Sequence, residues 1–217
     1  MRDVVIGMSD GLTVPFALAA GISGAIASSR IVVTAGIAEV AAGAIAMALG
    51  GYLAARTDLE HYRSEERRER DEVVRIPEAE RREVQTILES YGLEDETLLA
   101  ATRAITTNRD KWVGFMMRQE LGLESPDPKR AFASGATIGA SYIIGGLIPL
   151  LPYMLLPDSA KGLIVSAVVT MAALLLFGAV KGKLTGASPL ISAIQTVLIG
   201  GVASAVAFGL AKLVQHM

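Results

Sequence analysis

Two carboxylates stand alone in long apolar stretches of the chain. Asp10 is the only charged residue between Val4 and Ser29, and Glu39 is the only one between Ile31 and Ala55. Each stretch is long enough to cross a bilayer, which takes roughly 20 residues. An acid at that depth is costly unless it faces a partner, a cavity or an ion. The pattern therefore predicts a path for a cation or a proton through a membrane.

The second stretch also predicts a specialised helix face. At about 100° per residue, a carboxylate, a thioether and several glycines fall within one arc of the helix. These residues are Gly36, Glu39, Gly43, Met47 and Gly50. Small residues allow close helix contact in lipid, while the carboxylate and the thioether add groups that bind a metal. The alternative is a plain packing face, in which a neighbour hydrogen-bonds Glu39 and Met47 fills space.

Asp10 precedes a proline in the same apolar stretch, Pro15. Proline removes a backbone donor and clashes with the preceding turn. The helix is therefore expected to open there and to free carbonyl oxygens as ligands. The alternative is that Asp10 anchors the helix near the membrane interface. On the first interpretation Asp10, like Glu39, supplies a hard oxygen ligand for a cation.

A third group of candidate ligands lies between Arg56 and Arg130, where most of the 20 basic and 22 acidic residues are concentrated. Glutamates recur there with helical spacing, and two methionines precede the last of them. The set consists of Glu65, Glu69, Glu72, Glu80, Glu83, Met116, Met117 and Glu120. Carboxylates suit Mg²⁺, Ca²⁺ or Mn²⁺, and added thioether sulfur moves the preference toward Fe²⁺. The alternative is a solvated helix face, because Glu66–Arg70 and Glu78–Arg82 have the spacing of ordinary ion pairs.

Composition narrows the function classes. The 217 residues are 52% hydrophobic, and the net charge of −2 leaves no basic surplus to attract nucleic acid. The sequence has no cysteine, no Gly-x-x-x-x-Gly-Lys loop, no Gly-x-Ser-x-Gly and no His-Glu-x-x-His. This argues against disulfides, ATP-driven transport and hydrolase chemistry. Asp58-x-x-His61 is half of a di-iron pattern without its second half, so we expect neither an enzyme nor a cofactor.

Five long apolar stretches must position these residues, and they predict an all-α integral membrane protein with five transmembrane helices. The predicted spans are Val4–Ala27, Ile31–Ala55, Phe132–Leu151, Gly162–Val180 and Leu190–Ala211, with Pro149, Pro152 and Pro157 closing the third. The charged segment predicts a three-helix domain inserted between the second and third spans: 57–74, which can continue the second span, 78–91, and 95–121 with Asn108 as a candidate break. The domain boundaries are accordingly 1–56, 57–130 and 131–217.

Basic residues near the span ends predict the orientation. Arg2, Arg56, Lys129, Arg130, Lys181 and Lys183 fall on one side, and Arg30, Lys161 and Lys212 fall on the other. The positive-inside rule places the first side in the cytosol. We therefore expect the N-terminus and the insert in the cytosol and the C-terminus on the far side.

Several of these stretches resemble the vacuolar iron transporter family. The resemblance is carried by Ser9–Gly21, Ala35–Ile45, Gly50–Ala55, Phe115–Met117, Glu120–Glu124, Pro126–Pro128 and Gly145–Tyr153, and it covers essentially the whole chain. It implies a homodimer whose translocation pathway is lined by Asp10, Glu39 and Met47. It also implies a metal-binding insert whose ligands are Glu69, Glu72, Glu80, Glu83, Met116, Met117 and Glu120. The helical spacing adds Glu65 as a further candidate ligand.

The same resemblance implies a function and its partners. It implies export of Fe²⁺ from the cytosol in exchange for protons, with Mn²⁺ and other divalent ions as further cargo. The expected partners are divalent ions, protons, the bilayer and a second copy of the chain. The membrane would be the vacuolar membrane in a eukaryote and the plasma (inner) membrane in a prokaryote. Two alternatives stay open: a passive divalent-cation channel that uses the same acids, and a membrane metal sensor or buffer that transports nothing.

Overall fold

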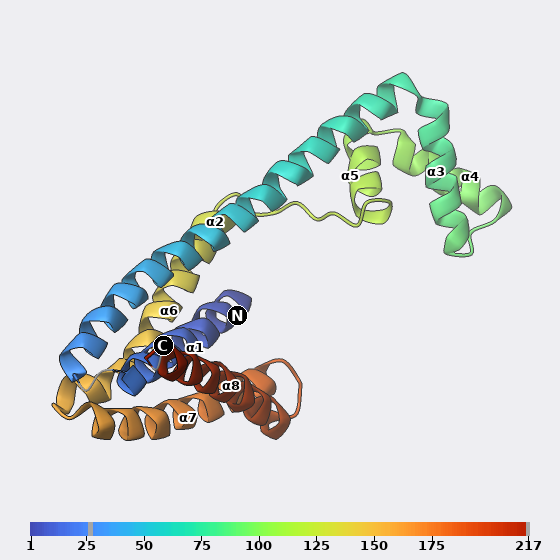
Figure 1. The fold of residues 1–217 in the computed structure, drawn as a ribbon. Coiled ribbons are helices and arrows are strands. Elements are labelled where there is room, and N and C mark those ends of the chain that lie inside the picture. The colour runs from blue at the N-terminus through green and yellow to red at the C-terminus, as the bar shows by residue number, and fades with distance from the viewer. Residues whose placement is uncertain (26–27, 216–217) are drawn as a thin grey trace. The chain divides into compact units, whose positions relative to one another are not determined.

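The computed structural model describes residues 1–25 and 28–215, so the predicted end of the first span at 26–27 lies outside the described residues. The described chain forms helices joined by turns, with no strand, which confirms the all-α prediction. The helices are α1 (Arg2–Ala25), α2 (Ser29–Arg75), α3 (Pro77–Ser90), α4 (Asp95–Thr106), α5 (Arg109–Gln119), α6 (Arg130–Leu155), α7 (Ser159–Leu184) and α8 (Pro189–Gln215) (Figure 1). The chain divides into two compact units, a membrane unit (1–53 with 131–217) and a second unit (54–130).

Five of these helices, α1, α2, α6, α7 and α8, are long and apolar enough to cross a membrane, which confirms the predicted number of spans. A helix satisfies most of its own backbone groups, so apolar side chains can face lipid at little cost. α2 continues without a break from Ser29 to Arg75, because neither proline nor glycine interrupts it after Ala55. The second span and the first helix of the charged segment are therefore one helix.

In the membrane unit, α6 packs closely against both α1 and α2. A methyl group added at Gly145 would lie 3.0 Å from the Leu12 amide of α1, and one added at Gly139 would lie 3.0 Å from the Ala48 side chain of α2. Larger side chains would push the helices apart, so these glycines set the spacing. An apolar cluster from the three helices fills the space beside them; its buried members are Ala19, Val32, Val40, Leu150 and Tyr153.

Three prolines lie inside helices, which corrects two expectations. α1 passes through Pro15 without opening, and α6 continues through both Pro149 and Pro152 instead of ending there. In an apolar bundle, a broken helix would leave more backbone groups unsatisfied than a proline does. Ser166 of α7 also contributes, because its hydroxyl donates to the Pro149 carbonyl at 2.7 Å. Pro157 does lie beyond the end of α6, as predicted.

The second unit has an apolar core of its own. Its buried members are Val73, Val84, Leu88, Trp112, Val113, Met116 and Met117. The last predicted helix, 95–121, is in fact two helices, α4 and α5, and the break falls at the candidate residue Asn108. The charged segment therefore contains the end of α2 and three further helices, rather than three helices in all.

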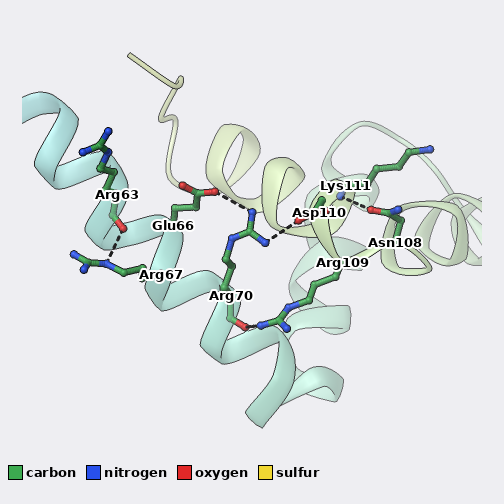
Figure 2. Close-up of polar contacts among 8 residues, drawn as sticks. All are labelled: Arg63, Glu66, Arg67, Arg70, Asn108, Arg109, Asp110 and Lys111. Atoms are coloured by element: carbon green, nitrogen blue, oxygen red, sulfur yellow. Dashed lines mark hydrogen bonds and ion pairs between the residues drawn. The ribbon is translucent and has the colours of Figure 1, made fainter. Parts of the chain in front are cut away.

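Polar contacts hold α5 against α2 within this unit (Figure 2). The Arg70 guanidinium of α2 binds the Asp110 carboxylate of α5 at 2.7 Å, and Arg109 donates to the backbone carbonyl of Arg70. The Asn108 side chain accepts a hydrogen bond from the Lys111 amide at 3.0 Å. Asn108 therefore caps the first turn of α5, which explains why the chain begins a new helix there.

Replacing Asn108 with Ala should destabilise α5 by about 1 kcal/mol, because an amide of the first turn loses its acceptor. Asn108→Ser keeps a capping oxygen and should lose much less. Hydrogen exchange of the α5 amides in the detergent-solubilised protein measures the difference. Equal exchange in the Ala and Ser variants would show that the cap contributes nothing to α5.

Candidate functional site

Glu39 of α2 uses its two carboxylate oxygens differently. Oε1 accepts a hydrogen bond from the Tyr142 hydroxyl of α6 at 2.5 Å. Oε2 is buried and has no hydrogen-bond partner among the residues that the structure describes. A buried oxygen without a partner is rare and costly, and a bound cation or a proton would remove that cost. Tyr142 therefore occupies Oε1 of Glu39, whereas Oε2 has no hydrogen bond within the described residues.

Asp10 lies on α1, next to a glycine that packs against the same tyrosine. Its neighbour Gly11 packs against Tyr142, and a methyl group added at Gly11 would collide with the Tyr142 carbonyl. The negative charge of Asp10 also acts on the Tyr142 hydroxyl. Asp10 itself is exposed on the single chain. Glu39 thus binds the Tyr142 hydroxyl, while the neighbour of Asp10 packs against the Tyr142 backbone.

The predicted glycine face of α2 is only partly used for packing. Gly36 and Gly43 lie against side chains of α6, whereas Gly50 has open space beside it. Met47 lies about two turns beyond Glu39 along α2 and is partly buried. Its part in a pathway remains a prediction.

In the second unit, two glutamates are almost completely buried. Glu69 of α2 is 1% exposed and Glu80 of α3 is 3% exposed, and in each the Oε2 atom lacks a hydrogen-bond partner in the described part of the chain. The negative charges of Glu83, Glu69, Glu72 and Glu120 all act on Glu80. The structure therefore brings these five predicted ligand acids into one electrostatic cluster.

This crowding changes the protonation of the acids. Burial, followed by the negative charge of Glu83, raises the pKa of the Glu80 carboxyl to about 7. Desolvation, followed by the charge of Glu69, raises the pKa of the Glu120 carboxyl to about 7 as well. The Glu120 side chain is exposed to water, which screens the neighbouring charges. These charges therefore act more strongly on the buried Glu80 carboxyl than on that of Glu120. Acids that repel one another near neutral pH favour a divalent cation, which removes the repulsion.

Arg68 of α2 supplies positive charge to the same acids. Its guanidinium lies 2.9 Å from the Glu65 carboxylate and 3.5 Å from the carboxylates of Glu69 and Glu72. About half of the Arg68 side chain is exposed, and exposed ion pairs of this kind are weak. Arg68 therefore neutralises part of the negative charge of the cluster through ion pairs that are weak and easily broken.

Met116 and Met117 belong to the apolar core of the second unit, where packing alone accounts for both side chains. Across residues 1–25 and 28–215, no group of three or more His, Cys, Asp or Glu side chains converges closely enough to hold a metal ion. The ligand roles of Glu65, Glu69, Glu72, Glu80, Glu83, Met116, Met117 and Glu120 remain predictions.

Sequence reasoning missed two residues of these sites. Arg68 has i−3 and i+4 spacing to Glu65 and Glu72 on one helix, which could have indicated its ion pairs. Tyr142 is a polar aromatic residue in a span without charged residues, and glycines lie nearby in the sequence. This pattern could have indicated that its hydroxyl hydrogen-bonds a group on another helix. Nothing in the sequence identifies that partner as Glu39.

Comparison with known proteins identifies the family. A model of the VIT family matches residues 1–212. The chain is 57% identical over 216 residues to Vacuolar iron transporter 1 of Arabidopsis thaliana, covering 100% of this chain and 86% of that protein. It is 55% identical over 215 residues to Vacuolar iron transporter 1 of Eucalyptus grandis, covering 99% of this chain and 86% of that protein. It is 37% identical over 221 residues to Protein CCC1 of Saccharomyces cerevisiae, covering 98% of this chain and 68% of that protein.

These matches extend over almost the whole chain and include both the membrane unit and the second unit. They confirm the resemblance seen in the sequence. The chain belongs to the VIT family.

Proposed function

We propose that this protein carries Fe²⁺ across a membrane in exchange for protons, with Mn²⁺ and other divalent ions as further cargo. The observation that carries the proposal is the Glu39 carboxylate. It lies in an apolar helix with one oxygen buried and unpartnered among the described residues. The names of the relatives, which call them iron transporters, support iron as the cargo.

The same acids can serve both ions. A divalent cation is stabilised by ionised carboxylates, whereas a proton neutralises one of them. Metal and protons therefore compete for Asp10 and Glu39, and this competition couples the two fluxes when each ion loads from its own side. Met47 lies on the same helix as Glu39, and its thioether adds a soft contact that suits Fe²⁺.

We infer that the second unit collects the cation on the cytosolic side. The support comes from Glu69 and Glu80, whose buried Oε2 atoms lack partners within the described residues, and from the like charges around them. A cation bound there takes over the charge neutralisation that Arg68 provides in its absence. The excess of basic residues near the span ends on this side favours a cytosolic insert and N-terminus.

The exposure of Asp10 favours a homodimer. On the single chain Asp10 is exposed on an apolar helix, and a carboxylate that faces lipid is costly. A second copy packed against α1 covers it and encloses the path. The names of the relatives favour the vacuolar membrane in a eukaryotic cell, and in a prokaryotic cell we propose the inner membrane.

Glu39→Gln should abolish Fe²⁺ uptake by proteoliposomes and leave the fold intact. The amide keeps the size and can still accept from Tyr142, but it can neither balance a divalent charge nor carry a proton at neutral pH. We expect at least about a tenfold loss of rate, because losing a charged partner in a buried site costs more than ~1.4 kcal/mol.

Glu60→Gln is the matched control, since Glu60 is an exposed acid of the same helix. It should transport as the parent does. Near-normal uptake by Glu39→Gln would remove Glu39 from the pathway, and the proposed function would lose the observation that carries it.

Metal binding by the second unit should weaken as pH falls through about 7, the pKa of Glu80. A protonated carboxyl does not bind a cation, so acid competes with the metal, and the affinity recovers above that pH. Calorimetric titration with Zn²⁺ at about pH 8 and about pH 6 measures the change, with the full-length Glu39→Gln protein used to silence the pathway site.

Two variants complete that titration. Glu80→Gln should bind more weakly at the higher pH and should lose most of the pH dependence. Glu89→Gln changes an exposed acid of the same helix, α3, and should behave as its parent does. An affinity that stays constant between the two pH values would contradict the assignment of Glu80 as a ligand.

A further inference from the structure

The hydrogen-bond partner of Glu39 in the membrane unit is Tyr142, which has no role in the proposed exchange of metal for protons. Tyr142 lies on α6 and is only 2% exposed. Its hydroxyl donates to Oε1 of Glu39 at 2.5 Å, and Oε2 is left buried without a partner in the described chain. A hydrogen bond to an ionised carboxylate is roughly twice as strong as one between neutral groups. The bond therefore fixes which oxygen of Glu39 is occupied.

Two glycines, one beside each pathway acid, make room for this tyrosine. Gly43 lies about one turn beyond Glu39 on α2, and a methyl group there would collide with the Tyr142 hydroxyl and ring. Gly11 follows Asp10 on α1, and a methyl group there would collide with the Tyr142 backbone. Packing from two helices thus sets the position of the hydroxyl, and the close-packed interior resists its displacement.

The chemistry of a hydroxyl suits a position beside a cation-binding acid. A lysine or arginine in this place would neutralise Glu39 and compete with the cargo. A hydroxyl donates one hydrogen bond and carries no charge. It orients Glu39 and leaves the full negative charge of the carboxylate available to a metal ion.

We propose that Tyr142 is a positioning residue for transport: its hydroxyl holds Oε1 of Glu39, so that Oε2 is the oxygen presented to the cation. This inference rests on the proposed function, in which Glu39 binds the cargo. Tyr142 acts through Glu39 and contributes to the affinity for the metal, in addition to its packing against α1 and α2.

A second tyrosine of the same helix provides a matched comparison. Tyr153 also lies on α6, is also 2% exposed, and accepts a hydrogen bond from the Ser23 hydroxyl at 3.0 Å. Tyr142 and Tyr153 are equally buried, but of these two tyrosines only Tyr142 hydrogen-bonds a carboxylate among the residues that the structure describes. Removing each hydroxyl in turn separates a role in positioning Glu39 from a role in packing.

The experiment measures initial rates of Fe²⁺ uptake by proteoliposomes over a range of Fe²⁺ concentrations. Tyr142→Phe keeps the ring and should raise KM about tenfold or more, the usual effect of losing a hydrogen bond to a charged group. Tyr153→Phe should keep the parent KM. A purely structural role would lower the maximal rate, through fewer folded transporters, and leave KM unchanged.

A second pair of variants keeps every tyrosine. Gly43→Ala should displace the Tyr142 hydroxyl and raise KM as Tyr142→Phe does. Gly201→Ala, at a glycine of α8 with open space beside it, should keep the parent KM. If Tyr142→Phe does not fold, the Gly43→Ala variant decides the question by the same criterion.

The outcomes separate this inference from the proposed function. A normal rate in Glu39→Gln overturns both. An inactive Glu39→Gln together with a parent KM in a folded Tyr142→Phe overturns the positioning role alone. A raised KM in Tyr142→Phe, with Tyr153→Phe and Gly201→Ala unchanged, supports it.

Discussion

Glu39 keeps a carboxylate on an apolar helix with one oxygen buried away from water, and such burial is costly. One oxygen is satisfied by Tyr142, and the other has no partner in the described residues. The Tyr142 side chain reaches Glu39 only because Gly43 leaves space beneath it. Gly43, Tyr142 and Glu39 therefore depend on one another. We expect a substitution at any one of them to change the positions of the other two.

The second unit meets the same physical problem with different means. Glu69 and Glu80 are buried next to an apolar core, and other acids crowd around them. Arg68, whose side chain is about half exposed, neutralises part of this charge. Here the remaining cost appears as a pKa near neutrality for Glu80, so a small change in pH or a divalent cation alters its charge. Both units thus hold glutamates with a buried oxygen that has no hydrogen-bond partner within the described residues.

Much of this arrangement could be predicted from the sequence, because the charge-free stretches, the uninterrupted α2 and the capping residue Asn108 are local features. The predicted helix end at Pro149 is wrong, because local rules do not weigh the cost of an open helix in an apolar bundle. Spacing along one helix placed Glu39 on a face but gave no information on the register of the neighbouring helix. The contact with Tyr142 depends on that register, so only the three-dimensional structure reveals it.

In the proposed mechanism, a metal ion and protons compete for the same carboxylates. The most direct measurement records internal pH and internal Fe²⁺ together in sealed vesicles after Fe²⁺ is added outside. We expect protons to leave as the metal enters, in a constant ratio, and Glu39→Gln to abolish both signals. Clear metal entry with a flat pH trace would contradict exchange and would leave a passive channel as the function.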